Sequence, residues 1–296
     1  MKYFPKKLTM TWIRNSYKEG SLTPEELAGE IVRRAEKYRD YNIWIVAPDL
    51  KRMMGYIEKL PKDMESLPLW GIPFAVKDNI DVAGSPTTAA CPDYAYDPKE
   101  DAAVVKKLIE AGAFPVGKTN LDQFATGLVG TRSPYGEVKN ALDPELISGG
   151  SSSGSAVSVA LGMAAFSLGT DTAGSGRVPA ALNCLVGYKP SLGAWSTKGV
   201  VPACASLDCV TVFANSLEDA EKVNLAARGV DEECCWSREY KEPLPKLPKK
   251  ICLAKDGVTF YGPYEDIYKA KWEQAKKRIE DMGTVSYTHL RAHETE

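Results

Sequence analysis

The sequence contains almost no histidine, and this scarcity limits the chemistry that the chain can perform. Only two of its 296 residues are histidines, His289 and His293, and both lie in the final segment, SYTHLRAHETE. A Ser-His-Asp triad, a Cys-His pair or a histidine-rich metal site needs histidine within the folded body. We therefore expect neither a metal nor a cofactor. Any nucleophile must be activated by another base, and lysine is the first candidate.

Cysteine is present but lacks informative spacing. The seven cysteines form no CxxC pair, and their odd number argues against a disulfide framework. We expect reduced thiols, several of them in the core. No segment has the length and apolarity of a membrane span, because the run from Ala156 to Leu168 is short and contains glycine and serine. The N-terminus also lacks the apolar centre of a signal peptide, so we expect a cytoplasmic protein that does not bind membranes.

An excess of positive charge is missing as well. The formal net charge is -2, and lysine and glutamate are interspersed without a basic stripe. Nucleic acid is therefore not an expected partner, and a small molecule is favoured. With 44% hydrophobic and 26% charged residues, the chain is long enough to fold around one large core or two modest ones.

Helix and strand patterns alternate along the chain, which is typical of an α/β fold. The clearest helix start is the capping box Thr23-Pro24-Glu25-Glu26. The apolar run Gly71 to Val76 predicts a buried strand that ends in Lys77, and α/β proteins place their chemistry at such strand ends. Other expected elements are strands at 43–47, 114–116 and 251–254 and helices at 49–60, 101–111, 217–227 and 264–282.

The stretch from Ser148 to Ala180 holds two Gly/Ser-rich turns on either side of an apolar run. Such composition is by itself typical of a flexible linker, but a linker does not alternate with buried segments. We expect a helix from the first turn through Leu168. An anion-binding helix N-terminus is an alternative, although no lysine follows the glycines as it does in a P-loop. The serines expected to cap this helix are Ser152, Ser153 and Ser155.

Three segments resemble, in order, the consecutive motifs of the amidase signature family of serine hydrolases. They are GIPFAVKDN, ISGGSSSGSAVSVALG and LGTDTAGSGRVPAA, and the similarity covers about Leu69 to Phe213. The resemblance implies a mixed β-sheet core covered by helices. It also implies that Lys77 is the catalytic lysine, Ser151 the bridging serine and Ser175 the nucleophile. From its position alone Lys77 could equally be a solvated lysine at a strand end, but the two serine motifs favour the catalytic role.

The resemblance further implies how these residues work. Burial lowers the pKa of a lysine, so Lys77 can be neutral and take a proton from Ser151, which in turn takes one from Ser175. The peptide bond before Ser151 is expected to be cis. The backbone N–H groups of Thr172, Ala173 and Gly174, with that of Ser175, form the expected oxyanion hole.

Within the family, the resemblance is to the allophanate-hydrolysing branch. It rests on stretches such as TTAACPDYAYDPKEDAAVV and KTNLDQFATGLVGTRSPYG. The tRNA-dependent amidotransferase A subunit shares the catalytic motifs, but we expect DEFAMG there where this chain has DQFATG. Allophanate is a small amide with a carboxylate, for which Arg132 and Arg177 are candidate partners; either could instead be a structural ion-pair partner. Gly127 could approach the substrate through its backbone.

The resemblance also bears on partners and on completeness. It allows a homodimer and a functional link to a biotin-dependent urea carboxylase. The family domain is longer than this chain, so we expect its C-terminal part to be truncated. We expect an N-terminal helical segment at 1–68, an incomplete catalytic core at 69–285 and a non-native tail at 286–296. An inactive fragment or binding scaffold is therefore an alternative to an active amidase.

Overall fold

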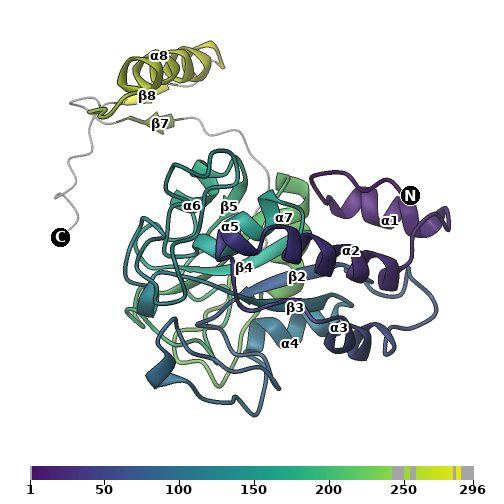
Figure 1. The fold of residues 1–296 in the computed structure, drawn as a ribbon. Coiled ribbons are helices and arrows are strands. Elements are labelled where there is room, and N and C mark those ends of the chain that lie inside the picture. The colour runs from purple at the N-terminus through teal and green to yellow at the C-terminus, as the bar shows by residue number, and fades with distance from the viewer. Residues whose placement is uncertain (1, 242–249, 254–257, 283–284, 288–296) are drawn as a thin grey trace. The chain divides into compact units, whose positions relative to one another are not determined.

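The computed structural model describes residues 2–241, 250–253, 258–282 and 285–287 of the chain (Figure 1). The chain divides into two units, Met1–Tyr240 and Lys241–Glu296. All the predicted site residues belong to the larger unit. Both histidines and residues 288–296 of the expected tail lie outside the described residues.

A six-stranded mixed sheet forms the centre of the larger unit, in the order β1-β3-β2-β4-β6-β5. Strand β2 pairs in parallel with both β3 and β4, whereas β1, β6 and β5 pair antiparallel with their neighbours. Every residue of β2, β3, β4 and β6 is buried. The strands are β1 (Trp44–Val46), β2 (Pro73–Lys77), β3 (Phe114–Thr119), β4 (Phe166–Asp171), β5 (Val186–Tyr188) and β6 (Cys209–Ala214). The expected α/β fold with a mixed sheet is confirmed.

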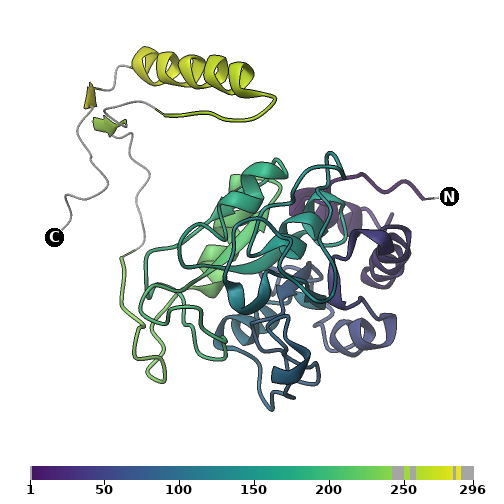
Figure 2. The same ribbon diagram turned by 60° about the vertical axis from the view of Figure 1, so that its left-hand side comes forward.

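Helices cover this sheet, as the two views in Figures 1 and 2 show. Helix α5 lies across β2, β3, β4 and β6, and α4 packs against β3 and α7. The α-helices of this unit are α1 (Met10–Lys18), α2 (Pro24–Lys37), α3 (Leu50–Ile57), α4 (Ala103–Glu110), α5 (Ser153–Ala160), α6 (Val178–Leu182) and α7 (Leu217–Ala227). Short 3₁₀ turns are found at Arg39–Tyr41, Pro92–Tyr94 and Gln123–Ala125.

The predicted start of α2 is confirmed in detail. The Thr23 hydroxyl accepts a hydrogen bond from the Glu26 N–H, and the Glu26 carboxylate accepts one from the Thr23 N–H. Pro24 occupies the first helical position, where its missing N–H costs nothing. Helix α7 also spans the predicted residues.

The predicted helix through Leu168 is wrong, because the apolar run holds a helix and a strand. Helix α5 ends at Ala160, Gly162 adopts a left-handed backbone with φ of 70°, and β4 begins at Phe166. Every residue of α5 and β4 is buried, so neither element has the solvent-exposed face whose periodicity separates helix from strand.

The capping role predicted for the serines of this turn is also wrong. Helix α5 has no side-chain cap at its N-terminus. Instead, the Ser152 hydroxyl donates to the Thr170 carbonyl (3.1 Å) and the Ser155 hydroxyl to the Leu168 carbonyl (2.9 Å). Both carbonyls belong to β4, so these serines link the N-terminal part of α5 to β4 by hydrogen bonds. Their polar atoms are satisfied within the core, as buried hydroxyls require.

The smaller unit contains three described elements. Strands β7 (Lys250–Cys252) and β8 (Val285–Tyr287) pair in parallel. The strand predicted at 251–254 is thus present, although Ala254 lies outside the described residues. Helix α8 (Glu265–Asp281) has no buried residue, in agreement with the predicted surface helix.

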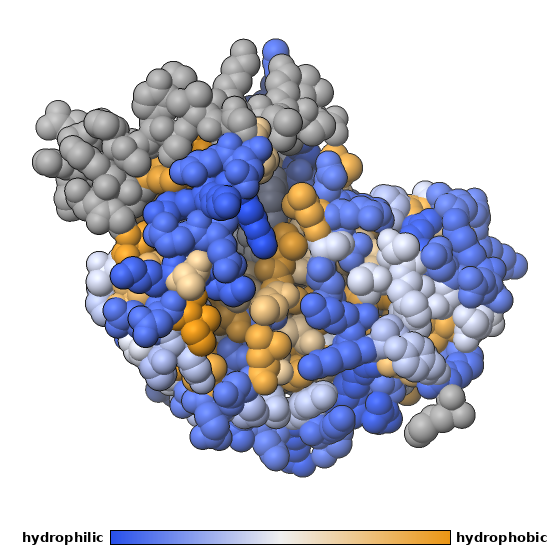
Figure 3. Space-filling view, turned by 90° about the horizontal axis from the view of Figure 1, so that it is seen from above, coloured by the Kyte–Doolittle hydropathy of each residue, from blue (hydrophilic) through white to orange (hydrophobic). Residues whose placement is uncertain are grey.

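In the space-filling view of Figure 3, hydrophilic side chains predominate and hydrophobic ones lie among them. No helix among the described residues has both the length and the apolarity needed to cross a membrane.

Candidate active site

Strand β2 ends by placing a lysine in the protein interior. The side chains before it, from Phe74 to Val76, are fully buried, and Lys77 itself is 0% exposed. Its Nζ lies 2.7 Å from Ser151 Oγ and 2.8 Å from Thr170 Oγ1. Thr170 comes from the neighbouring strand β4, so the sheet itself aligns the lysine with one of its two partners.

The environment of Lys77 favours its neutral form. Burial lowers the pKa of Lys77 from 10.5 to about 7, and the carboxylates of Asp122, Asp208 and Asp171 oppose that change without cancelling it. Both hydrogen-bond partners of the amine are hydroxyls. A neutral amine can donate to Thr170 and accept from the Ser151 hydroxyl, which is the arrangement that a base requires.

Ser151 is held on the other side of this contact. It is fully buried, and the Gly150–Ser151 peptide bond is cis, as expected. The Ser151 carbonyl accepts a hydrogen bond from the Asp122 N–H (3.0 Å). The Ser151 hydroxyl therefore contacts Lys77, and the Ser151 carbonyl is hydrogen-bonded to the loop that follows β3.

The predicted nucleophile lies in the loop after β4. Ser175 is 4% exposed, and Asp171, at the end of β4, organises the loop around it. The Asp171 carboxylate accepts hydrogen bonds from the N–H groups of Gly174 (2.7 Å) and Gly176 (3.0 Å). Burial raises the pKa of Asp171, but bonds from Arg177 and these amides outweigh it, so the net pKa is lowered. Asp171 thus stays ionised and fixes both neighbours of Ser175.

Two details of this loop differ from the predicted site. The Gly174 N–H donates to the Asp171 carboxylate (2.7 Å), so in this structure it is already engaged and not directed at an oxyanion site. Among the described residues, no hydrogen bond engages the N–H groups of Thr172, Ala173 or Ser175. Nor does any hydrogen bond in this part of the chain join Ser175 to Ser151.

Comparison with known proteins decides the family. A model of the family named Amidase matches residues 26–293. The chain belongs to the amidase signature family. This is the family that the three sequence motifs containing Lys77, Ser151 and Ser175 resemble.

Two sequence relatives and one solved structure illustrate the proteins to which this chain is similar. The urea amidolyase of Saccharomyces cerevisiae is 52% identical over 226 residues, covering 75% of this chain and 12% of that protein. The A subunit of the glutamyl-tRNA(Gln) amidotransferase from Methanosarcina mazei is 35% identical over 296 residues, covering 97% and 61%. The structure of Kluyveromyces lactis allophanate hydrolase matches with a TM-score of 0.84 and 43% identity, covering 95% of this chain and 47% of that one. The chain thus spans only part of each relative.

The two predicted carboxylate binders have protein partners in this structure. The Arg177 guanidinium contacts Asp171 through two nitrogens at 2.9 and 3.0 Å, with its side chain 56% exposed. Arg132 donates to the Thr126 carbonyl (2.8 Å) and is exposed. Gly127 lies against the Asp122 carboxylate, which a Cβ at this position would meet at 2.6 Å. Gly127 therefore has no room for a side chain.

Three residues of the site were missed by reasoning from the sequence: Asp122, Thr170 and Asp208. Asp122 holds the Ser151 carbonyl and is the strongest of the carboxylates that act on Lys77. Thr170 accepts from Lys77, and Asp208 accepts from the Thr172 hydroxyl and from the N–H groups of Ala203 and Cys204. The sequence did contain an indication for Asp122, because this residue closely follows the buried strand β3 and polar groups at strand ends are candidates for function.

Proposed function

We propose that this chain carries the amide-hydrolysing centre of an allophanate hydrolase, with Ser175 as nucleophile, Ser151 as relay and Lys77 as base. One observation carries the proposal: the 2.7 Å contact between Lys77 Nζ and Ser151 Oγ in an environment that lowers the pKa of Lys77 to about 7. A lysine that is neutral near physiological pH and hydrogen-bonded to a serine is a competent general base.

The first half-reaction forms an acyl-enzyme. Neutral Lys77 accepts the proton of the Ser151 hydroxyl while Ser151 accepts that of Ser175, and Ser175 Oγ attacks the amide carbonyl. Because Ser175 and Ser151 are not hydrogen-bonded in the described structure, this step requires their two hydroxyls to come within hydrogen-bond distance when substrate binds. The N–H groups of Thr172, Ala173 and Ser175 are the donors available to the oxyanion.

The acyl-enzyme forms when the proton on Lys77 travels back through Ser151 to the leaving nitrogen, so that the carbon–nitrogen bond breaks and ammonia departs. The second half-reaction then returns the enzyme to its starting state. Water then attacks the acyl carbonyl, with the same relay as its base, and breaks the bond to Ser175 Oγ. The dicarboxylate released from allophanate loses carbon dioxide spontaneously, so the overall products are ammonia and carbon dioxide.

The substrate assignment is supported by the relatives that are named for allophanate hydrolysis or urea amidolysis. Allophanate presents a carboxylate, which Arg132 or Arg177 would bind after exchanging its present protein partner, with Gly127 lining the site. We further infer a cytoplasmic homodimer that acts with a biotin-dependent urea carboxylase.

A glutamine-hydrolysing activity is the second candidate. It is favoured by the identity to the amidotransferase of Methanosarcina mazei, which extends over 97% of this chain. The two substrates differ in the group opposite the amide: glutamine carries an α-amino group and allophanate does not.

The deciding experiment is ammonia release by this chain from allophanate, malonamate and glutamine. We expect allophanate to be preferred, and alanine at Lys77, Ser151 or Ser175 to lower kcat by about a thousandfold or more. Ser158→Ala is the matched control, because the hydroxyl of this buried serine donates to the Ser155 carbonyl within α5, and no hydrogen bond in the described part of the chain joins it to the proposed catalytic residues. Alanine variants with the wild-type rate would refute the mechanism, and a preference for glutamine would select the second candidate. Failure to release ammonia from any amide would favour an inactive scaffold.

A further inference from the structure

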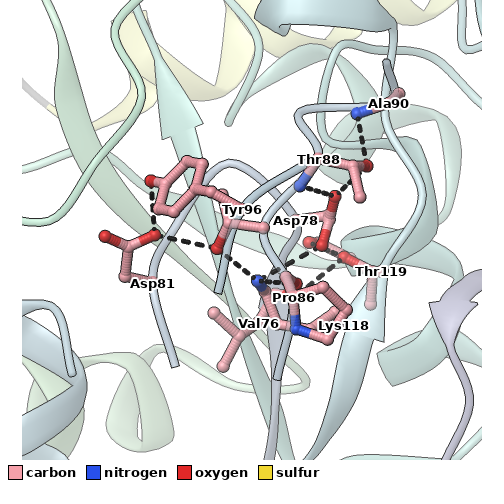
Figure 4. A network of polar contacts seen from close by, with 11 residues as sticks. Val76, Asp78, Asp81, Pro86, Thr88, Ala90, Tyr96, Lys118 and Thr119 are labelled. Carbon is pink, nitrogen blue, oxygen red and sulfur yellow. Dashed lines mark hydrogen bonds and ion pairs between the residues drawn. The ribbon is translucent and has the colours of Figure 1, made fainter. Parts of the chain in front are cut away.

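A second buried lysine lies on the strand next to that of Lys77, and the mechanism does not use it. Lys118 on β3 is 1% exposed, and its Nζ lies 3.2 Å from the carboxylate of Asp78, which is 0% exposed (Figure 4). The ammonium also donates to the Pro86 carbonyl (3.1 Å) and the Thr87 hydroxyl (3.0 Å). A buried ion pair is a weak source of stability, because the cost of removing both charges from water offsets their attraction.

The Asp78 carboxylate is also bound to the loop that follows Pro86. Its second oxygen accepts hydrogen bonds from the Thr88 N–H (2.9 Å) and the Thr88 hydroxyl (2.5 Å). The Thr88 hydroxyl in turn accepts from the Ala90 N–H (3.1 Å). Figure 4 shows these groups converging on Asp78. Ala89 and Ala90 have φ angles of 49° and 58°, which alanine rarely adopts, so the loop needs such external bonds to keep its shape.

This loop supports a second loop, which holds the bridging serine. The Ala89 carbonyl accepts from the Phe124 N–H (2.9 Å), and the Ala90 carbonyl accepts from the Gln123 side-chain amide (3.0 Å). Phe124 is itself left-handed, with a φ of 51°. One residue before Gln123, the Asp122 N–H donates to the Ser151 carbonyl (3.0 Å).

We infer that Lys118, Asp78 and Thr88 are positioning residues for Ser151, acting through residues 88–90 and then residues 122–125. Lys118 pairs with the Asp78 carboxylate, Asp78 and Thr88 fix the left-handed loop, and that loop holds the segment whose N–H fixes the Ser151 backbone. Lys77 and Asp78 are consecutive in sequence. One therefore contacts the hydroxyl of Ser151, while the other supports the backbone of the same serine through two loops.

The test compares matched variants in the chain as it stands. Thr88→Val removes the hydroxyl, whereas Thr88→Ser keeps it, so the serine variant is the conservative control. Asp78→Asn breaks the buried ion pair. Glu30→Gln is its control, because Glu30 and Arg34 form another buried ion pair, with both side chains 7% exposed, on α2.

The first measurement is amide hydrogen exchange, which does not depend on catalysis. We expect Thr88→Val and Asp78→Asn to speed exchange at the N–H groups of Asp122 and Phe124 by about tenfold, with the two controls close to wild type. Unchanged protection in both test variants would overturn the inference. Equal loss of protection in Glu30→Gln would also overturn it, because the effect would then be a general loss of stability.

The second measurement is the rate at which a fluorophosphonate labels Ser175, forming an Oγ–P bond and releasing fluoride. Since small misplacements of reacting groups cost large factors, we expect labelling to slow by about 10- to 100-fold in Thr88→Val and Asp78→Asn. Thr88→Ser should restore the wild-type rate. Faster exchange with unchanged labelling would refute the positioning role. This arm rests on the proposed function; if wild-type Ser175 is not labelled, that function fails, while hydrogen exchange still decides whether the network holds Asp122.

Discussion

Two buried lysines on adjacent strands carry different chemistry because their partners differ. Burial lowers the pKa of both Lys77 and Lys118. Lys77 meets only the hydroxyls of Ser151 and Thr170, which neutral nitrogen satisfies as well as ammonium does. Lys118 meets the carboxylate of Asp78, which favours the charged form. These partners support the proposed base role of Lys77 and give Lys118 an ion-pairing role instead.

The base role of Lys77 predicts the pH dependence of catalysis. Only the neutral amine accepts a proton from Ser151, so kcat/KM should rise with pH through an apparent pKa near the value of about 7 given by the environment of this lysine. The measurement is a pH profile of ammonia release under conditions where substrate is far below KM. A profile that is flat from mildly acidic to alkaline pH would contradict the assignment.

At this scale, sequence reasoning supplied the proposed reacting groups but not the residues that hold them. Lys77, Ser151 and Ser175 belong to motifs that can be read along the chain. Asp122 could not be given a role, because its importance arises from a backbone N–H that meets Ser151 only after folding. The direction of the Gly174 N–H toward Asp171 is likewise a property of the folded loop.

At the scale of elements, α5 is the helix on which the site depends, and its packing is unusually close. A Cβ added at Gly154 would lie 2.4 Å from the Ile43 carbonyl oxygen and 2.8 Å from the backbone nitrogen and oxygen of Asn120. The helix therefore touches the backbone before β1 and after β3 directly. Only glycine permits this approach, and it sets the distance from α5 to the sheet.

This packing predicts opposite effects for two glycine-to-alanine substitutions in helices. Gly55 in α3 has no atom within 4 Å of an added Cβ, so Gly55→Ala should raise the free energy of unfolding by about 0.5–1 kcal/mol through helix propensity. Gly154→Ala should lower it by about 1–3 kcal/mol, because overpacking exceeds the propensity gain. Urea unfolding of both variants is the measurement. An increase in stability for Gly154→Ala would show that α5 is not held against these backbones.

The elements predicted well are those with a polar side. Helix α2 has a capping box and a solvated face, and α7 is bounded by Ser216, whose hydroxyl accepts from the Asp219 N–H. The elements that were predicted wrongly have no contrast between a buried face and a solvated face. The run from Ala156 to Leu168 is buried throughout, so burial alone could not separate α5 from β4. Helix α1 and strand β5 were not anticipated; β5 is only three residues long and half-buried.

At the scale of the whole molecule, the site makes folding depend on pH. The larger unit buries several ionisable groups completely, among them Lys77, Asp78, Asp122 and Asp171. Most of these are matched by opposite charges or by several N–H donors. Among the described residues, no carboxylate is hydrogen-bonded to Lys77, so its ammonium form lacks a direct counter-charge. At every pH at which Lys77 is protonated in the unfolded chain, the lowered pKa of Lys77 in the folded chain therefore reduces the free energy of unfolding.

Comparison of wild type with Lys77→Met should reveal this cost. Between pH 7 and 10.5 the folded chain holds Lys77 largely neutral while the unfolded chain holds it charged. The unfolded state then binds more protons, so the free energy of unfolding of the wild type should rise with pH by up to about 1.4 kcal/mol per pH unit relative to the methionine variant. Below pH 7 both states of the wild type are protonated, and the difference between the two proteins should become constant. Urea unfolding from pH 6 to 10 is the measurement, and a difference that does not change with pH would mean that Lys77 keeps an ordinary pKa in the folded chain.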